Sequence, residues 1–259
     1  MNIGIIGYGN IGELITQNII KHDFHDFNKL YISNRTFSKI EHLKDIDHDI
    51  FITKDNKEIV KNCEKIIISV KTPDLINVLE EIKPYMTQNT QIIHTCAGIN
   101  FKFKNNGLSC VIPTISSTYD KNNPKKGVSI IYHDNNVPLE NKKFVEELFS
   151  EFSQIKIIDT TQDLEIATIA ASCMPAFIAL SAEMFSEKLE KKCNLTKEEL
   201  FKIIIETLNS TSYLLKEDIY SPTELINKVA TENGITQKGL NTLNKELPDI
   251  YNKLILKLL

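Results

Sequence analysis

The chain has 259 residues, of which 42% are hydrophobic and 25% charged, and its formal net charge is −4 at pH 7. These values are typical of a globular protein of one or two domains and argue against a general binder of nucleic acid or membrane surfaces. We expect no membrane span, no signal peptide, no metal site and a cytoplasmic location, because no apolar run reaches about 18 residues and the cysteines and histidines are scattered.

The chain opens with a short apolar strand over residues 3–6, a glycine-rich turn, and a helix predicted over 13–20. The turn reads Gly7-Tyr8-Gly9-Asn10-Ile11-Gly12, the G-x-G-x-x-G spacing that seats a pyrophosphate between a strand and a helix N-terminus. Gly7 allows the tight turn, Gly9 lets the backbone approach phosphate, and Gly12 lets the helix pack closely. We predict a dinucleotide site here; the alternative is a glycine turn without a ligand.

The second predicted strand, residues 30–33, indicates which dinucleotide binds. A site that selects NAD carries an Asp or Glu after this strand, and this chain has Asn34, Arg35 and Thr36 instead. Arg35 can pair with a 2′-phosphate, and Ser33, Asn34 and Thr36 can hydrogen-bond to it. The pattern favours NADP, with NADPH preferred over NADH; the alternative is a solvated arginine.

Strands and helices continue to alternate to about residue 158. This pattern predicts an α/β Rossmann-type domain over residues 1–159, with a mostly parallel, doubly wound sheet. The further predicted strands are 50–52, 65–70, 91–94, 109–112, 128–131 and 155–158, and the further predicted helices are 56–62, 75–82 and 137–149.

Only helices are predicted over residues 160–259, which we expect to form an all-helical domain. A long helix over 163–192 carries apolar residues on more than one side, and Pro175 should kink or split it. Thr196 can cap a second helix that runs to about residue 216, Pro222 starts a third, and residues 238–259 supply more.

Motifs that occur in order along the whole chain carry a family resemblance. They are Gly7-Tyr8-Gly9-Asn10, Ser33-Asn34-Arg35-Thr36, Asp55-Asn56, Val70-Lys71-Thr72-Pro73-Asp74, Ala97-Gly98-Ile99, Val111-Ile112-Pro113, Pro175-Ala176-Phe177 and residues 231–240. In these motifs the chain resembles the pyrroline-5-carboxylate reductase family. The resemblance implies reduction of a cyclic imine to L-proline with NAD(P)H, in proline biosynthesis. It also implies an interleaved homodimer or higher homo-oligomer, with the active site between the two domains.

The resemblance assigns substrate roles near the C-terminus. Thr236 aligns with the threonine whose hydroxyl approaches the imine nitrogen, and Thr231 aligns with a serine near the substrate carboxylate. Gly234 and Ile235 precede a helix expected to start near Gln237, so their N–H groups can bind that carboxylate. Without the resemblance, both threonines are better explained as helix caps.

Further cofactor contacts are expected at strand ends. Asn56 resembles the asparagine that meets the adenine-side ribose, and Val70 and Lys71 follow the fourth predicted strand. Lys71 either steadies phosphate or ribose oxygens or is simply solvated. The turn Thr95-Cys96-Ala97-Gly98 is predicted to meet the nicotinamide ribose through its backbone, and we interpret Cys96 as a turn cysteine, not a nucleophile.

Several positions depart from the family pattern close to the chemistry. They are Thr114, Ser172, Met174 and Asn233, of which the last three replace family glycines. These changes leave open a reductase of a different imine, and an NADP-binding regulatory or catalytically impaired member. A relative of β-hydroxyacid dehydrogenases is disfavoured, because the long helix has no lysine near Cys173.

Overall fold

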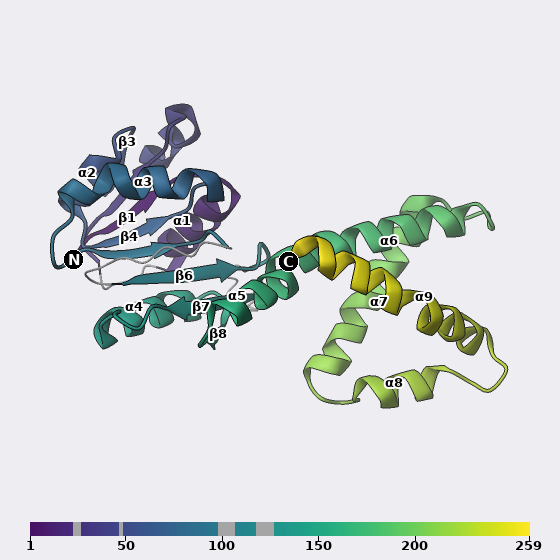
Figure 1. Ribbon diagram of the computed structural model, residues 1–259. Helices are drawn as coiled ribbons and strands as arrows, with labels where there is room; N and C mark the ends of the chain where they lie inside the picture. Colours follow the sequence, from purple (N-terminus) through teal and green to yellow (C-terminus); the bar gives the residue numbers. More distant parts are fainter. Residues whose placement is uncertain (23–26, 47–48, 98–106, 118–126) are drawn as a thin grey trace. The chain divides into compact units, whose positions relative to one another are not determined.

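The structure, a computed structural model, describes residues 1–22, 27–46, 49–97, 107–117 and 127–259 and forms two compact units, 1–175 and 176–259. The first unit contains one sheet of eight strands in the order β3-β2-β1-β4-β5-β6-β7-β8 (Figure 1). The strands are β1 Ile3–Ile6, β2 Leu30–Ser33, β3 Ile50–Thr53, β4 Lys65–Ile68, β5 Gln91–His94, β6 Leu108–Pro113, β7 Val128–His133 and β8 Gln154–Ile158. All neighbours are parallel except β6 and β7, which confirms the predicted mostly parallel sheet.

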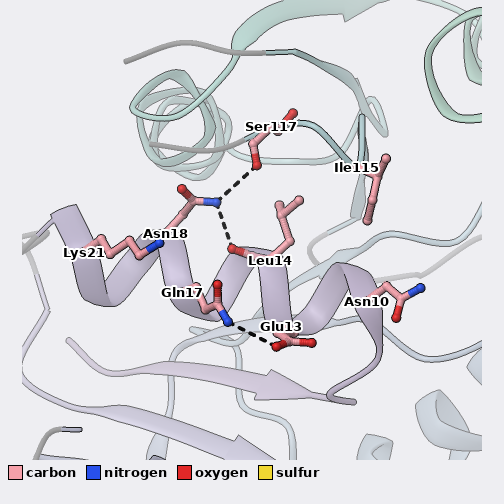
Figure 2. Close-up of a pocket in the computed structure, with 8 residues that line it drawn as sticks. All are labelled: Asn10, Glu13, Leu14, Gln17, Asn18, Lys21, Ile115 and Ser117. Carbon is pink, nitrogen blue, oxygen red and sulfur yellow. Dashed lines mark hydrogen bonds between the residues drawn. The ribbon is translucent and has the colours of Figure 1, made fainter. Parts of the chain in front are cut away.

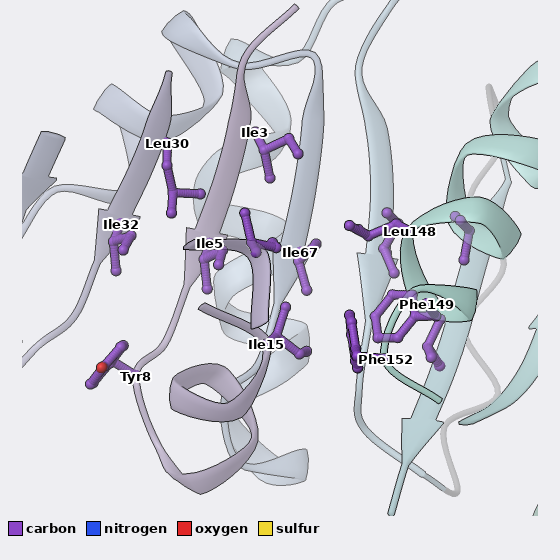
Figure 3. Packing of buried hydrophobic residues seen from close by; sticks show 14 of the residues in the cluster. Ile3, Ile5, Tyr8, Ile15, Leu30, Ile32, Ile67, Leu148, Phe149 and Phe152 are labelled. Carbon is purple, nitrogen blue, oxygen red and sulfur yellow. The ribbon is translucent and has the colours of Figure 1, made fainter. Parts of the chain in front are cut away.

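Both faces of this sheet are covered, because successive side chains of a strand point to opposite faces. Ile5 and Ile67 lie in the cluster of one face with residues of α1 and α4, as Figure 3 shows, whereas Ile6 and Ile68 pack on the other face with α2 and α3. The helices are α1 Asn10–His22, α2 Asn56–Asn62, α3 Leu75–Ile82 and α4 Leu139–Ser150. Short 3₁₀ turns, η1 Phe37–Lys39, η2 Glu41–Asp45, η3 Thr72–Asp74 and η4 Lys83–Tyr85, connect them.

The strand order fixes where a ligand can bind. β1 pairs with β2 on one side and with β4 on the other, so the chain changes direction across the sheet at β1. In open α/β sheets, ligands bind beyond the carboxyl ends of the strands at such a switch point. The turns after β1, β2, β3 and β4 therefore converge on one edge of the sheet.

The long helix expected over 163–192 is divided, as predicted from Pro175. It consists of α5 Thr161–Thr168, a π-helical segment η5 at Ile169–Cys173, and α6 Met174–Glu190. Proline has no N–H group and its ring clashes with the preceding turn, and a π segment is one way to accommodate this disturbance. Ser172 and Met174, two of the positions that depart from the family pattern, lie in or beside this segment.

The expectation that no segment has the length and hydropathy of a membrane span is wrong for this helical run. Thr161–Glu190 comprises 30 residues, includes an 18-residue window of mean hydropathy 1.7, and has only 17% of that window buried. Alanines and large apolar residues share the run with few charges, which a search for unbroken apolar stretches misses. This surface needs a cover, from lipid or from protein.

The second unit is entirely helical, and two of its helices begin where Thr196 and Pro222 predict. α7 Lys197–Lys216 and α8 Pro222–Val229 both begin with capping boxes, from Thr196 and Ser221, and α9 spans Ile235–Leu258. Over residues 176–259, all of which the structure describes, only Ala182, Ser186 and Leu200 are buried. A single copy of this unit therefore has almost no hydrophobic core of its own.

The predicted domain boundary after residue 159 stays a prediction. The last strand ends at Ile158, but α5 and η5 pack on the sheet through Leu164 and Ala171, so the first compact unit extends to Pro175.

Candidate active site

The glycine turn is built as its spacing predicts. Gly7 adopts a φ of +98°, in the left-handed region, and a Cβ there would lie 2.6 Å from the carbonyl oxygen of Ser69. A Cβ on Gly12 would collide with the carbonyl oxygen of Gly7. Around Gly9, by contrast, a Cβ would meet nothing within 4 Å. Gly7 and Gly12 are thus required by the turn itself, whereas Gly9 leaves open space above it.

Helix α1 directs its N-terminus at this space. Its first intrahelical bond runs from the Glu13 N–H to the Gly9 carbonyl at 2.8 Å. The N–H groups of Asn10, Ile11 and Gly12 precede that bond and have no partner within the helix. Together with the helix dipole, they form a favourable environment for an anionic pyrophosphate.

Asn34 braces the turn, a role that the sequence did not reveal. Its side-chain oxygen accepts from the Tyr8 N–H at 3.1 Å, and its amide group donates to the Thr36 carbonyl at 2.8 Å. The Tyr8 ring is buried in the core, where burial and the nearby Glu13 raise the pKa of its hydroxyl to about 12. The Asn34 side chain and the Tyr8 N–H, both predicted to contact the cofactor, therefore hydrogen-bond to each other and fix the shape of the turn.

A groove of about 880 Å³ follows this edge of the sheet. It brings together most of the predicted cofactor residues from the ends of β1, β2 and β4 and from the segment that follows β3. Those that line it are Gly7, Tyr8, Gly9, Asn10, Ile11, Ser33, Asn34, Arg35, Thr36, Asn56, Val70 and Lys71. The lining residues that were not predicted to contact the cofactor are Ile6, Lys39, Lys54, Ser69, Asp74, Asn77, Val78 and Glu81, whereas Thr95 belongs to the predicted turn of residues 95–98. The size and the donors suit a dinucleotide, and no acidic residue follows β2.

A hydrogen-bonded chain spans one end of the groove. The buried Ser33 hydroxyl donates to the side-chain oxygen of Asn56 at 2.7 Å, and the Asn56 amide group donates to the Glu81 carboxylate at 2.9 Å. These bonds join β2, α2 and α3 and orient the Asn56 side chain. Asp55 caps α2 by accepting from the Lys57 N–H at 2.9 Å, which holds Asn56 at the helix start.

The other end of the groove is polar but lacks a nucleophile among the groups described. The hydroxyls of Ser69 and Thr95 lie 3.1 Å apart, at the ends of β4 and β5. The Cys96 thiol donates to the Val70 carbonyl at 3.2 Å, and burial raises its pKa to about 11. A protonated, buried thiol is a poor nucleophile, in agreement with the interpretation of Cys96 as a turn cysteine.

Four predicted cofactor residues do not line the groove or cannot be placed. Gly12, Cys96 and Ala97 do not line the groove. Gly12 packs against the Gly7 carbonyl instead. Gly98 lies outside the described residues. Their cofactor roles stay predictions.

A second, smaller cavity of about 230 Å³ lies between α1 and the turn after β6 (Figure 2). Asn18 crosses from α1 to the Ser117 carbonyl at 3.4 Å, and Asn10 lines this cavity as well as the groove. Thr114, which departs from the family pattern in this turn, donates its hydroxyl proton to the Val128 carbonyl at 2.9 Å. That hydroxyl thus serves the strand pair β6–β7.

The predicted substrate residues lie in the second unit, at the start of α9. This helix begins at Ile235 and not near Gln237, because Gly234 is its N-cap. Ile235 and Thr236 therefore occupy the first turn, where N–H groups have no partner within the helix. Asn233 adopts a φ of +62°, which asparagine tolerates better than most residues, so it can replace a glycine here. A Cβ on Gly234 would collide with the Thr231 hydroxyl.

Comparison with known proteins decides the family. Residues 161–258 match the model for pyrroline-5-carboxylate reductase dimerisation, and residues 2–98 match a model described as NADP oxidoreductase, coenzyme F420-dependent. A pyrroline-5-carboxylate reductase of Methanobrevibacter smithii is 73% identical over 245 residues, 95% of this chain and 98% of the relative. The chain belongs to the pyrroline-5-carboxylate reductase family.

More distant reductases of this family agree. Pyrroline-5-carboxylate reductase 3 of Bacillus subtilis strain 168 is 31% identical over 97% of this chain and 92% of its own length. The solved reductase of Streptococcus pyogenes matches the fold with a TM-score of 0.84 at 21% identity, covering 100% of this chain and 96% of its own. The Plasmodium falciparum pyrroline carboxylate reductase, solved with NADP bound, matches with a TM-score of 0.80 at 22% identity, covering 100% and 94%. These findings confirm the predicted family and fold class.

Proposed function

We propose that this chain is an NADPH-dependent reductase that converts pyrroline-5-carboxylate to L-proline. The observation that carries the proposal is the 73% identity to a curated pyrroline-5-carboxylate reductase over almost the full length of both proteins. We extend the proposal to a cytoplasmic homo-oligomer that acts in proline biosynthesis.

The cofactor end of the reaction is assigned to the groove of the first unit. The backbone at Gly9, Asn10 and Ile11 would hold the pyrophosphate, while Asn56 would meet the adenine-side ribose in the orientation that Ser33 and Glu81 impose. Lys71 would contact phosphate or ribose oxygens from the end of β4. The nicotinamide supplies a hydride when bound, and the residues of the groove orient it.

The substrate end is assigned to the start of α9. Reduction of a C=N bond places a hydride on carbon and a proton on nitrogen, so a hydroxyl near the nitrogen is needed to position that proton. Thr236 is assigned this role, while Thr231 and the N–H groups of Ile235 and Thr236 are assigned to the substrate carboxylate. The N–H group of Gly234, predicted for the same contact, donates instead to the Thr231 carbonyl at 2.9 Å. The helix dipole favours an anion at this position.

The proposal is tested by following NADPH absorbance with the purified chain and two cyclic imines. We expect oxidation of NADPH with pyrroline-5-carboxylate and much slower oxidation with pyrroline-2-carboxylate. The reverse order would reassign the substrate to a different imine. Tight NADPH binding without turnover of either imine would instead indicate an NADP-binding regulatory or catalytically impaired member of the family.

Arg35→Ala is expected to remove most of the preference for NADPH over NADH. The guanidinium follows β2, where an acid would otherwise select NAD, and it lines the groove. Losing one charged partner of the 2′-phosphate should weaken NADPH binding by about tenfold or more and leave NADH nearly unchanged. Calorimetric titration with both dinucleotides measures this. Equal affinities of the wild type for NADPH and NADH would contradict the assignment.

We also infer an obligate homodimer with interleaved helices, formed through residues 160–259. Large apolar side chains remain exposed on every long helix of the second unit, including Ile178 and Phe185 on α6, Ile203 on α7 and Ile250 on α9. A second copy would cover them, and would account for the apolar run Thr161–Glu190 without a membrane. Sedimentation at micromolar concentration should show a dimer or higher oligomer. A stable folded monomer would refute the inference.

A further inference from the structure

Two basic residues in the groove, Lys39 and Lys54, have no role in the account given so far. Lys54 directly follows β3, which pairs in parallel with β2, so that Thr53 lies opposite Ser33. The Asn34 N–H donates to the Thr53 carbonyl at 3.2 Å and extends this pairing past the strand ends. Lys54 is therefore carried alongside the segment that presents Arg35, and both residues line the groove.

The side chain of Lys54 is held near the groove by an aromatic ring. Its Nζ atom lies 5.5 Å from the centre of the Phe37 ring, in the 3₁₀ turn η1 that follows Arg35. Phe37 itself packs against the core cluster of the sheet. A cation over a ring anchored in this way keeps its position better than a freely solvated lysine does. Lys39, from the same turn, also lines the groove.

The charges that line the groove are unevenly distributed. Arg35, Lys39 and Lys54 come from the segments that follow β2 and β3, whereas the carboxylates, Asp74 and Glu81, come from η3 and α3, where Lys71 is the one lining cation among the described residues. Glu81 also accepts a hydrogen bond from Asn56. The β2–β3 side thus offers three cations to a ligand group of high negative charge.

We propose that Lys54 is a second specificity-determining residue, which binds the 2′-phosphate of the cofactor together with Arg35. The inference rests on the proposed NADP site and deepens it. A phosphate monoester carries up to two negative charges, more than one guanidinium neutralises, and a lysine acts on it as a point charge that needs no fixed fork geometry. Lys54 accounts for the part of the NADPH preference that remains after Arg35→Ala.

Lys57 provides a matched control three residues away. It carries the same charge, and its Nζ atom lies 5.7 Å from the centre of the Tyr85 ring, but it does not line the groove. Lys54→Met and Lys57→Met remove the same charge from the same region and retain the apolar stem. Any difference between the two variants therefore reports on the groove and not on the net charge of the domain.

The experiment is a calorimetric titration of the full chain with adenosine 2′,5′-bisphosphate and with 5′-AMP, which differ by the 2′-phosphate and need no turnover. We expect Lys54→Met to weaken binding of the bisphosphate by about tenfold and to change 5′-AMP by less than about twofold. Lys57→Met should change neither, and Lys54→Arg should retain most of the affinity. Melting temperatures of all variants serve as the check on folding.

The outcomes separate the inference from the proposed function. A wild type that binds the two nucleotides equally would overturn both the NADP assignment and the role of Lys54. A wild type that prefers the bisphosphate, with Lys54→Met behaving like Lys57→Met, would overturn the role of Lys54 alone. Equal losses for both nucleotides in a folded Lys54→Met would also overturn it, since the effect would not involve the 2′-phosphate.

Discussion

Gly9→Ala is expected to produce a folded protein that has lost most of its affinity for NADPH. A Cβ at this position meets no protein atom within 4 Å, so the protein itself tolerates it. The same Cβ projects into the space where the pyrophosphate would approach the backbone. Overpacking of this kind costs about 1–3 kcal/mol, or a weakening of roughly fivefold to more than a hundredfold. Calorimetry for NADPH and a melting curve for the free protein test the two parts separately.

Gly12→Ala is the matched comparison, because here the added Cβ collides with the Gly7 carbonyl in the protein itself. Gly12→Ala should therefore lower the melting temperature, whereas Gly9→Ala should not. The assignment of the groove to a dinucleotide would be wrong if Gly9→Ala bound NADPH as the wild type does.

Thr236→Ala is expected to lower kcat for imine reduction by roughly ten- to a hundredfold, because one hydroxyl contact that strengthens in the transition state contributes about 1–3 kcal/mol. NADPH affinity should be nearly unchanged, since the groove residues that are assigned to the cofactor belong to the first unit. Steady-state kinetics with pyrroline-5-carboxylate and a separate NADPH titration measure the two effects.

Thr236→Ser is the control for the hydroxyl itself. Serine keeps the oxygen and tolerates the first turn of a helix, so much of the activity should remain. Intact turnover in Thr236→Ala combined with weakened NADPH binding would show that Thr236 belongs to the cofactor site. Equal losses in both variants would indicate that the methyl group matters and not the hydroxyl.

The parts of the site that are continuous in sequence could be predicted from it. The strand, glycine turn and helix at residues 3–22 carry their geometry in adjacent residues, and the capping boxes at Thr196 and Ser221 are set by residues three positions apart. Helix α9 begins at Ile235, two residues before the predicted start near Gln237. The prediction missed this start because its N-cap, Gly234, has no side chain that could cap the helix.

The missed residues are those that only the strand order brings to the groove. Lys54 and Glu81 are distant from the glycine turn in sequence, and they reach the groove because β3 lies beside β2 and α3 packs against α2. Asn34 was predicted to contact the cofactor and lines the groove, but its hydrogen bond to the Tyr8 N–H depends on a tertiary contact across 26 residues. No pattern within one element could have indicated these contacts.

The central claim, that this chain reduces pyrroline-5-carboxylate with NADPH, is tested most directly by following the transferred hydride. Purified wild-type chain is incubated with pyrroline-5-carboxylate and NADPH deuterated at the transferred position of nicotinamide carbon 4, and the product is analysed by mass spectrometry. The account predicts L-proline that carries one deuterium on the former imine carbon, formed in step with the loss of NADPH. Tight binding of NADPH with no deuterated proline would contradict it.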